Sequence, residues 1–351
     1  MKIFGFAGTA KNTGKTTTAL AVLEQSRLAG FKNAITSIGY DGESLDHITG
    51  LPKPRYQLLP GELIATAREC LEDSPARCKV LLETNIETVL GTILIAEVQE
   101  AGLVLLAGPN RESDLRFVLQ EFATLGVEFA IVDGALNRIV PLICTDGLIF
   151  STGAAFKQKA AQIAVHAAAI ECIFRLPQAE TTLSRGEIVI RYKNGTTNTL
   201  PGGSLISSDT IKQLGSLLTK SCTDITIPGA CQPKLLAEII PAIPDGTNIH
   251  LGSPLKMIAS GDALFWTHIL SLANGKNIII DMLETLPLLL FTINPFYTQY
   301  LQKNGIYQAA YIDAKHLLEI MRENVHHTPV FDTMQPIEST IKSWFELNFP
   351  Q

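Results

Sequence analysis

The chain has 351 residues, of which 46% are hydrophobic and 18% are charged, and its formal net charge is −6 at pH 7. This composition supplies enough apolar side chains for one large α/β domain and a smaller appended one. No uninterrupted apolar run approaches the roughly 20 residues of a bilayer-spanning helix, and no lysine- and arginine-rich cluster offers the basic surface that nucleic-acid binding requires. We therefore expect neither a membrane protein nor a nucleic-acid-binding protein.

The first residues run directly into an apolar, strand-like segment, so we expect no signal peptide and a cytoplasmic location. Six scattered cysteines form no C-x-x-C pair, which favours reduced thiols over disulfides or a zinc site. The pair His326-His327 has no further ligand at metal-binding spacing, so we interpret it as part of a solvated loop.

Short apolar runs alternate with helical patterns through the first half of the chain, which is typical of parallel βαβ units. The predicted strands are residues 3–7, 34–38, 79–83, 103–107, 129–132 and 148–151. The predicted helices are residues 15–28, 62–71, 93–100, 114–125 and 155–173. Because the strands are apolar throughout, we expect a doubly wound, mostly parallel sheet that is covered on both faces.

The pattern changes after about residue 175. Residues 187–192 and 196–200 flank Asn194-Gly195, which predicts a β-hairpin with a type I′ turn. Helix-like and strand-like runs then alternate again and predict a second, smaller α/β domain. The expected organisation is a first domain of residues 1–175, a hairpin connection of residues 176–200 and a second domain of residues 201–351.

The strongest functional signal is the loop that follows the first predicted strand. That strand runs into Gly8, and Gly14-Lys15-Thr16-Thr17 opens the first helix. In a Walker A loop, backbone N–H groups face the phosphates, the lysine reaches the β- and γ-oxygens, and the hydroxyl binds Mg²⁺. The predicted nucleotide-binding residues are Gly8, Thr9, Ala10, Lys11, Asn12, Thr13, Gly14, Lys15, Thr16 and Thr17.

The loop departs from the usual pattern at one position. The place five residues before Gly14 normally holds glycine, but here it holds Thr9, and the glycine stands one residue earlier at Gly8. The alternative interpretation is a chance Gly-Lys-Thr at the start of a helix. The apolar strand before the loop and the helix after it favour a phosphate-binding loop.

A magnesium–nucleotide site also needs a carboxylate to hold metal-bound water. Residues 129–134 form an apolar strand that ends in Asp133-Gly134 and resembles a Walker B element. Asp133 is therefore our predicted indirect ligand of Mg²⁺, and a simple turn cap is the alternative.

Lesser candidates end other predicted strands, where ligands collect in open α/β sheets. They are Glu83-Thr84, Gly108-Pro109-Asn110, Ser151-Thr152-Gly153 and Asn294, which is a candidate for contact with a base or a partner; an ordinary turn is the alternative for each.

The shifted glycine gives the loop the form Gly-Thr-x-x-x-x-Gly-Lys-Thr, which resembles dethiobiotin synthetase and its relatives among the SIMIBI-class P-loop proteins. Another branch of that class carries a second signature lysine at the position that Ala10 occupies here. Lys11 lies one residue further on, so it is a candidate for phosphate contact across a homodimer interface. The class also places a switch aspartate after the second strand. This resemblance gives Asp41 a role in orienting water and metal, with Glu43 and an ordinary Asp-Gly turn as alternatives.

Several stretches together resemble the P-loop subunit of the reactivase that serves the cobalamin-dependent lysine 5,6-aminomutase and ornithine aminomutase. They are residues 8–17, 36–43, 51–55, 132–138, 151–154 and 292–295. The resemblance implies that Mg-ATP hydrolysis is coupled to remodelling of a protein partner, either the partner subunit or the aminomutase. Damaged cobalamin would then leave and intact cofactor would enter. The catalytic residues implied are Lys15, Asp41 and Asp133, and the metal-binding residues are Thr16, Asp41 and Asp133.

Two other functions stay open at this point. Dethiobiotin synthetase implies an ATP-dependent small-molecule ligase, but its Lys-Pro near the end of the second strand is replaced here by Tyr40-Asp41, and Lys53-Pro54 comes much later. A nucleotide-sensing module with negligible turnover is the third reading. ATP is preferred over GTP only through the resemblance, because no Asn-Lys-x-Asp base-reading motif occurs.

Overall fold

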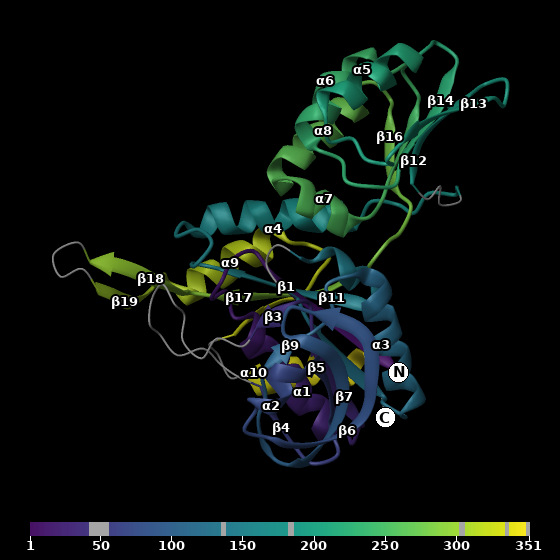
Figure 1. Ribbon diagram of the computed structural model, residues 1–351. Helices are drawn as coiled ribbons and strands as arrows, with labels where there is room; N and C mark the ends of the chain where they lie inside the picture. Colours follow the sequence, from purple (N-terminus) through teal and green to yellow (C-terminus); the bar gives the residue numbers. More distant parts are fainter. Residues whose placement is uncertain (42–55, 135–137, 182–185, 302–305, 334–336, 349–351) are drawn as a thin grey trace. The chain divides into compact units, whose positions relative to one another are not determined.

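The structure is a computed structural model that describes residues 1–41, 56–134, 138–181, 186–301, 306–333 and 337–348 (Figure 1). It divides into two compact units, one of Met1–Ala164 with Leu288–Gln351 and the other of Val165–Pro287. In the part of the chain that is described, no helix combines the length and apolar character that crossing a membrane would take.

A nine-stranded sheet forms the centre of the first unit, in the order β20-β17-β11-β1-β10-β2-β5-β7-β6. All neighbouring pairs are parallel except β5 with β7 and β7 with β6. The predicted α/β class with a mostly parallel sheet is therefore confirmed. The strands are β1 (Lys2–Gly8), β2 (Asn33–Ser37), β5 (Leu63–Ala67), β6 (Arg77–Thr88), β7 (Gly91–Glu100), β10 (Phe129–Asp133), β11 (Gly147–Gly153), β17 (Leu288–Asn294) and β20 (Val330–Asp332).

Helices cover both faces of this sheet. Alternate residues of β1 point to opposite faces of the sheet. Phe6 points to the face covered by α1 and α10, where it shares a core with Val22 and Trp344. Gly5 points to the other face, where a Cβ would lie 3.1 Å from Leu142 of η1. The helices of this unit are α1 (Lys15–Leu28), α2 (Arg68–Glu72), α3 (Glu112–Thr124), η1 (Val140–Cys144), α9 (Ala314–Asn324) and α10 (Ile337–Asn348).

The first helix begins and ends close to where the sequence predicts. It ends at Leu28, and the N–H of Gly30 donates to the Arg27 carbonyl at 2.9 Å. Gly30 has a φ of 77°, which only glycine adopts without strain, so it terminates the helix. The predicted helix over 114–125 is confirmed in the same way as α3, since it also ends just before a glycine, Gly126.

Two predicted helices are wrong. Residues 62–71 contain strand β5, whose five residues are all buried, and only the short helix α2 follows it. Residues 93–100 belong to strand β7, which pairs with β5 on one side and β6 on the other. A short apolar run does not distinguish a buried strand from a helix by its periodicity, and here burial between two neighbouring strands overrides the helix propensity of Ala, Leu and Glu.

The expected domain boundaries are also corrected by the structure. The predicted second domain, 201–351, is divided, because β17 and β20 return to the large sheet, where β17 pairs with β11 and β20 pairs with β17. The smaller unit is Val165–Pro287, and the residues expected to form a connection, 176–200, belong to it. It is thus inserted in sequence between two strands that are neighbours in space.

The second unit contains a five-stranded sheet in the order β13-β12-β14-β15-β16, of which β14, β15 and β16 are parallel. The predicted hairpin is confirmed as β12 and β13, but its type I′ turn is wrong. The Gly195 N–H donates to the Tyr192 carbonyl at 2.8 Å, and only Gly195, at a φ of 80°, has the positive φ that a type I′ turn would also require of Asn194. The strands are β12 (Glu187–Tyr192), β13 (Thr197–Pro201), β14 (Cys222–Ile227), β15 (Asn248–Leu251) and β16 (Ile279–Met282). The helices are α5 (Ser208–Leu217), α6 (Pro233–Ile239), η2 (Ile240–Ala242), α7 (Pro254–Ser260) and α8 (Ala263–Asn274), and α4 (Ala160–Phe174) begins in the first unit and continues into the second.

Three short two-stranded sheets complete the first unit. The hairpin of β18 (Phe296–Leu301) and β19 (Ile306–Tyr311) follows β17 and projects from this unit (Figure 1). Strand β3 (Tyr40–Asp41) pairs with β9 (Leu106–Ala107), and β4 (Gln57–Leu58) pairs with β8 (Gly102–Leu103). The single strand predicted over residues 103–107 is therefore two short pieces, in β8 and β9.

Candidate functional site

The loop after β1 is folded back on itself and tied to the neighbouring strand β11. The Thr9 N–H donates to the Ser151 carbonyl at 3.0 Å, and the Thr9 hydroxyl donates to the Thr152 hydroxyl at 3.0 Å. Within the loop, the Thr13 hydroxyl donates to the Ala10 carbonyl at 3.0 Å. A Cβ on Gly8 would lie only 2.7 Å from the Thr13 Oγ1, so this compact turn requires glycine at position 8.

Helix α1 begins directly after this loop, with Gly14 as its N-cap at a φ of 89°. Because glycine has no side chain, it cannot cap the N–H groups of the first helical turn as Ser, Thr, Asp or Asn would. The first turn carries no acidic residue either. The positive end of the helix dipole and its N–H donors are thus suited to an anion that comes from outside the chain.

The ammonium group of Lys15 lies beside the carboxylate of Asp133. Lys15 Nζ is 2.7 Å from Asp133 Oδ1 and also donates a hydrogen bond to the Gly134 carbonyl. Asp133 has a fully buried side chain, and Lys15 is 18% exposed. Asp133 ends β10, where it pairs with Phe6 of β1, so the parallel register brings two residues that are far apart in sequence to the same edge of the sheet.

The predicted carboxylate at position 41 is placed only by its backbone. Asp41 ends the short strand β3, where it pairs with Leu106 of β9, and the Ile38 N–H donates to the Asp133 carbonyl at 2.8 Å. The end of β2 therefore lies next to the end of β10. The side chain of Asp41 and the whole of Glu43 lie outside the described residues, so their predicted contacts with water and metal stay predictions. Lys11 is exposed on the loop, and its predicted role at a dimer interface is likewise untested.

The strand order makes this edge of the sheet a natural place for a ligand. Strands β1 and β11 are parallel neighbours, but the chain leaves them in opposite directions. From β1 it passes through α1 to β2 on one side, and from β11 it passes through α4 and the second unit to β17 on the other side. Ligands of open α/β sheets bind in the crevice that such a divergence leaves at the carboxyl ends of the strands.

Residues from the end of the chain complete the surroundings of the loop. Asn294 Nδ2 donates to the Asn12 carbonyl at 3.1 Å, and a Cβ on Gly14 would lie 3.1 Å from Thr333. Asn294 was a lesser candidate, expected in a different domain, and Thr333 was missed. The signal that could have found Thr333 is its position directly after the short apolar strand β20.

Buried hydroxyl groups connect the loop's helix to these strands. The Thr18 hydroxyl donates to the Thr292 hydroxyl at 2.9 Å, and the hydroxyls of Ser151 and Thr292 lie 2.8 Å apart. Two other lesser candidates are paired with arginine side chains, and their predicted ligand contacts stay predictions. Asn110 accepts a hydrogen bond from Arg138 at 2.6 Å. Glu83, on the edge strand β6, forms an ion pair with Arg68 of α2. Four strands of the sheet lie between β6 and β1.

A second cluster of titratable side chains, which sequence reasoning missed, lies on one face of the sheet in the second unit. His250 on β15 has a carboxylate at each ring nitrogen: Asp281 Oδ1 is 2.6 Å from Nδ1, and Asp224 Oδ1 is 3.3 Å from Nε2. The strand register places these residues side by side, because His250 pairs with Asp281 and its neighbour-but-one Asn248 pairs with Asp224. The sequence did not indicate this cluster, because its members lie on three strands and each strand contributes only one or two of them between apolar residues.

This cluster predicts a contribution to acid stability. Burial alone would raise the pKa of Asp224, but hydrogen bonds from Asn248, Thr223 and His250 outweigh it and hold the pKa below its usual value of 3.8. A pKa that is lower in the folded than in the unfolded chain stabilises the protein above the unfolded value, and this stabilisation is lost as the pH falls through the folded value. We expect Asp224→Asn to remove part of the fall in unfolding midpoint between about pH 5 and about pH 3, measured by circular dichroism. An unchanged difference between the two pH values would contradict this assignment.

Buried thiols in the second unit are poor candidates for chemistry. Burial raises the pKa of Cys231 to about 12, and burial together with the nearby Asp224 raises the pKa of Cys222 to about 11. Both thiols therefore stay protonated at neutral pH, where the thiolate is the reactive form.

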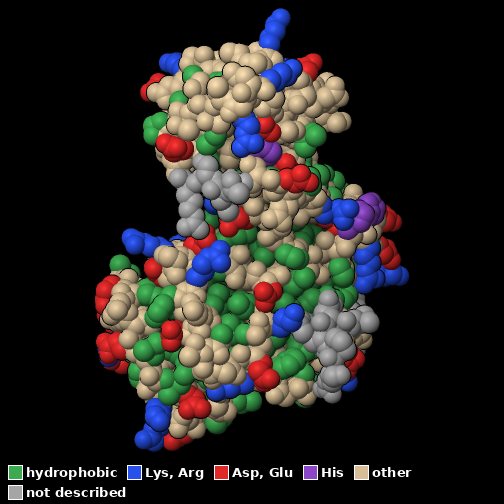
Figure 2. Space-filling model, turned by 90° about the vertical axis from the view of Figure 1, so that its right-hand side faces the viewer, with side chains coloured by type: hydrophobic (Ala, Val, Ile, Leu, Met, Phe, Trp, Pro, Cys, Tyr) green, Lys and Arg blue, Asp and Glu red, His purple; other side chains and the backbone are tan. Residues whose placement is uncertain are grey.

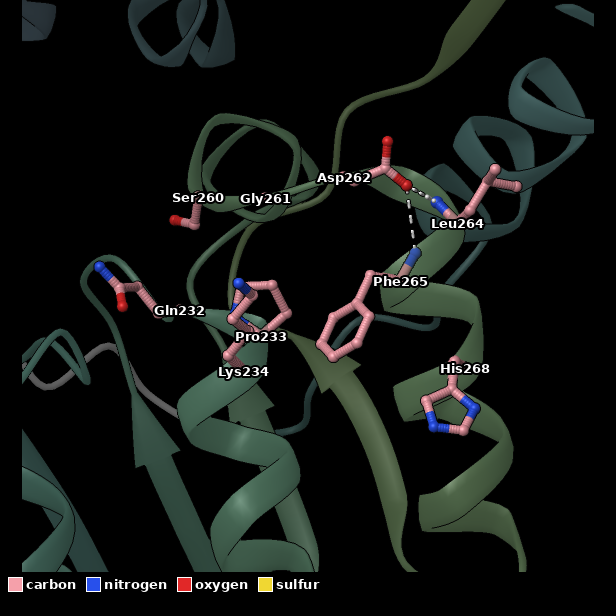
Figure 3. A pocket seen from close by; sticks show the side chains of 9 residues that line it. All are labelled: Gln232, Pro233, Lys234, Ser260, Gly261, Asp262, Leu264, Phe265 and His268. Carbon is pink, nitrogen blue, oxygen red and sulfur yellow. Dashed lines mark hydrogen bonds between the residues drawn. The ribbon is translucent and has the colours of Figure 1, made fainter. Parts of the chain in front are cut away.

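The second unit also contains a cavity of about 650 Å³ between α6, α7 and α8 (Figure 3). Phe265 points toward Pro233 in it, and Asp262 caps α8 by accepting hydrogen bonds from the N–H groups of Leu264 at 2.9 Å and Phe265 at 3.3 Å. The lining residues are Gln232, Pro233, Lys234, Ser260, Gly261, Asp262, Leu264, Phe265 and His268.

Exposed charges are mixed on the face drawn in Figure 2, where lysine and arginine side chains alternate with acidic ones among the residues described.

Comparisons of the chain with protein-family models, with curated proteins and with solved structures gave no match.

Proposed function

We propose that this chain is a P-loop ATPase that binds Mg-ATP at the loop from Gly8 to Thr17 and uses hydrolysis to remodel a protein partner. The observation that carries the proposal is the pairing of Lys15 with Asp133 at 2.7 Å, directly beside the uncapped start of α1. A Walker A lysine at the start of a helix and a Walker B aspartate at the end of a strand must lie close together to serve one nucleotide. Here the parallel pairing of β1 with β10 brings them together.

The loop fits a polyphosphate in its backbone as well as in its charge. Glycine is required at two places in its turn, because a Cβ on Gly8 would crowd Thr13, and Gly14 combines a positive φ with a close approach to Thr333. The N–H groups at the start of α1 and the Lys15 ammonium would together bind the β- and γ-phosphate oxygens. These donors and the carboxylate of Asp133 form the set that a Mg-nucleotide site needs.

Each residue then has a stated task. Bound Mg²⁺ supplies positive charge that neutralises the phosphate oxygens. Thr16 would hold the ion through its hydroxyl, and Asp133 would hold it through water. Lys15, now beside Asp133 and Gly134, would turn its ammonium to the phosphates. Asp41, whose backbone follows β2, would orient the attacking water.

The remodelling part of the proposal comes from the resemblance to the P-loop subunit of the aminomutase reactivase. It is supported by the position of the inserted unit in the sequence. Residues 165–287 lie between β11 and β17, and both strands end at residues that contact the loop, namely Ser151 and Thr152 in β11 and Asn294 in β17. The loop therefore borders both strands that connect to the inserted unit: β11 at the end that leads toward it, and β17 at the end opposite to its connection at Leu288.

Titration calorimetry and a phosphate-release assay test this proposal together. We expect Mg-ATP to bind and to be hydrolysed slowly, and we expect a cobalamin-dependent aminomutase to stimulate hydrolysis. Stimulation by a diamine with bicarbonate would favour the small-molecule ligase instead. Binding without turnover under all conditions would favour a nucleotide-sensing module, and the absence of binding by Mg-ATP and by Mg-GTP would overturn the nucleotide site itself.

A further inference from the structure

The carboxamide of Asn294 makes two hydrogen bonds to different parts of the first unit. Its Nδ2 donates to the Asn12 carbonyl in the loop at 3.1 Å, and its Oδ1 accepts from the Phe296 N–H at 3.0 Å. Both partners are backbone groups with fixed donor and acceptor roles, so the orientation of the carboxamide is determined by them. The side chain is buried, with 8% of the residue exposed. One side chain thus bridges the loop and the first residue of β18.

The backbone of Asn294 is held in place from the other side. Its carbonyl accepts from the Ala154 N–H at 2.9 Å, and a Cβ on Gly153 would lie only 2.0 Å from the Asn294 carbonyl oxygen. The main chain at Asn294 has little room to shift because β11 is so close. The strand thus fixes the backbone of Asn294, and the carboxamide is its link to the loop.

The loop partner of this bond has an unusual conformation. Asn12 has a φ of 64°, in the left-handed region that asparagine tolerates better than most other non-glycine residues. Two residues further on, Gly14 also has a positive φ and opens α1. The Asn12 carbonyl is therefore fixed in the segment that must turn its N–H groups toward a phosphate. Any reorientation of this peptide makes or breaks the bond to Asn294.

The hairpin on the other side of the bridge presents aromatic side chains to solvent. The rings of Phe296 and Tyr311 lie 5.6 Å apart, and those of Tyr300 and Tyr307 lie 5.1 Å apart. Tyr300 is 52% exposed and Tyr311 is 57% exposed. The Ile312 N–H donates to the Pro295 carbonyl at 3.0 Å and closes the base of the hairpin. Its position and its aromatic surface suit an element that responds to the state of the loop.

We propose that Asn294 is a positioning residue that couples nucleotide occupancy of the loop to the β18–β19 hairpin. The proposal rests on the proposed nucleotide site and adds a route by which that site is regulated. Coupling of this kind is reciprocal: if nucleotide binding changes the hairpin, then loss of the bridge must also change nucleotide affinity.

Hydrogen–deuterium exchange of the hairpin with and without Mg-ATP tests the coupling. In the wild type we expect Mg-ATP to change the exchange rate of backbone amides in β18 and β19 by about fivefold, the size of effect that one hydrogen bond gives. Asn294→Asp keeps the acceptor for the Phe296 N–H but cannot donate to the Asn12 carbonyl. Asn294→Asp and Asn294→Ala should both lose the nucleotide-dependent change and bind Mg-ATP about five- to tenfold more weakly.

The control is Gln308→Ala, an exposed position in the same hairpin, which should retain both the affinity and the exchange response. The wild-type experiment needs no variant, so it decides the question even if a substitution at Asn294 impairs folding. Unchanged hairpin exchange in wild-type protein that does bind Mg-ATP would overturn the coupling alone. A full exchange response in Asn294→Asp would also overturn it, whereas failure of the wild type to bind nucleotide would overturn the proposed function.

Discussion

Replacing Lys15 by alanine is expected to weaken Mg-ATP binding by about a hundredfold or more, because charge-assisted hydrogen bonds to phosphate contribute about 1.5–3 kcal/mol each and Lys15 would make more than one. Titration calorimetry measures the affinity. Lys212→Ala is a matched control, since it removes the same charge from α5, where Lys212 has 79% of its side chain exposed. If wild type and Lys15→Ala bound Mg-ATP with equal affinity, the assignment of this loop as the nucleotide-binding site would be wrong.

The same substitution has a second effect, which separates binding from folding. Lys15→Ala removes the ammonium partner of a fully buried carboxylate, and we expect this to lower the free energy of unfolding by about 2 kcal/mol. The double variant Lys15→Ala with Asp133→Asn should regain most of this stability, because the buried charge is gone. Nucleotide affinity should stay low in the double variant. Urea unfolding and calorimetry on the same preparations distinguish the two effects.

Asp133→Asn is expected to reduce the rate of ATP hydrolysis by about a hundredfold or more while affinity for Mg-ATP changes by less than about tenfold. The amide oxygen can still accept a hydrogen bond from Lys15, so the loop should keep its conformation. What is lost is the negative charge that would hold metal-bound water. Phosphate release at saturating Mg-ATP measures the effect.

The matched control for this variant is Asp224→Asn, which makes the same chemical change in the second unit. It should leave hydrolysis unchanged while altering only acid stability. If Asp133→Asn hydrolysed ATP at the wild-type rate, Asp133 would have only a structural role as the ion-pair partner of Lys15. The metal-binding role would then pass to another carboxylate near the loop, with Asp41 the first to test.

Two neighbouring strands of the large sheet, β11 and β17, flank the inserted unit in the chain. The insertion of residues 165–287 separates β11 from β17 in sequence, yet the two strands pair in parallel over six residue pairs from Leu148 with Leu288 to Gly153 with Asn294. The loop contacts the ends of both strands. The inserted unit is thus joined to the end of β11 that lies beside the loop and to the start of β17, whose other end contacts the loop.

Local chemistry let the sequence predict the elements that carry the site. The apolar runs of β1 and β10, the glycine-rich loop and the glycine after α1 are each set by residues close in sequence. Lys15 could therefore be predicted at the start of α1 and Asp133 at the end of β10. The hairpin of β12 and β13 was predicted for the same reason, because Asn194-Gly195 marks a turn between two strands, although the type of that turn was wrong.

Only the tertiary structure decided which of these elements meet. Residues 62–71 and 93–100 have helical composition, but pairing on both sides made strands of β5 and β7. Asn294 and Thr333 reach the loop because β17 and β20 pair with the large sheet, and strand pairing between distant segments depends on long-range burial rather than on nearby residues. The sequence by itself therefore determined the lysine, the aspartate and the loop, whereas the packing of distant strands determined the 2.7 Å contact between Lys15 and Asp133 and the link from the loop to the hairpin.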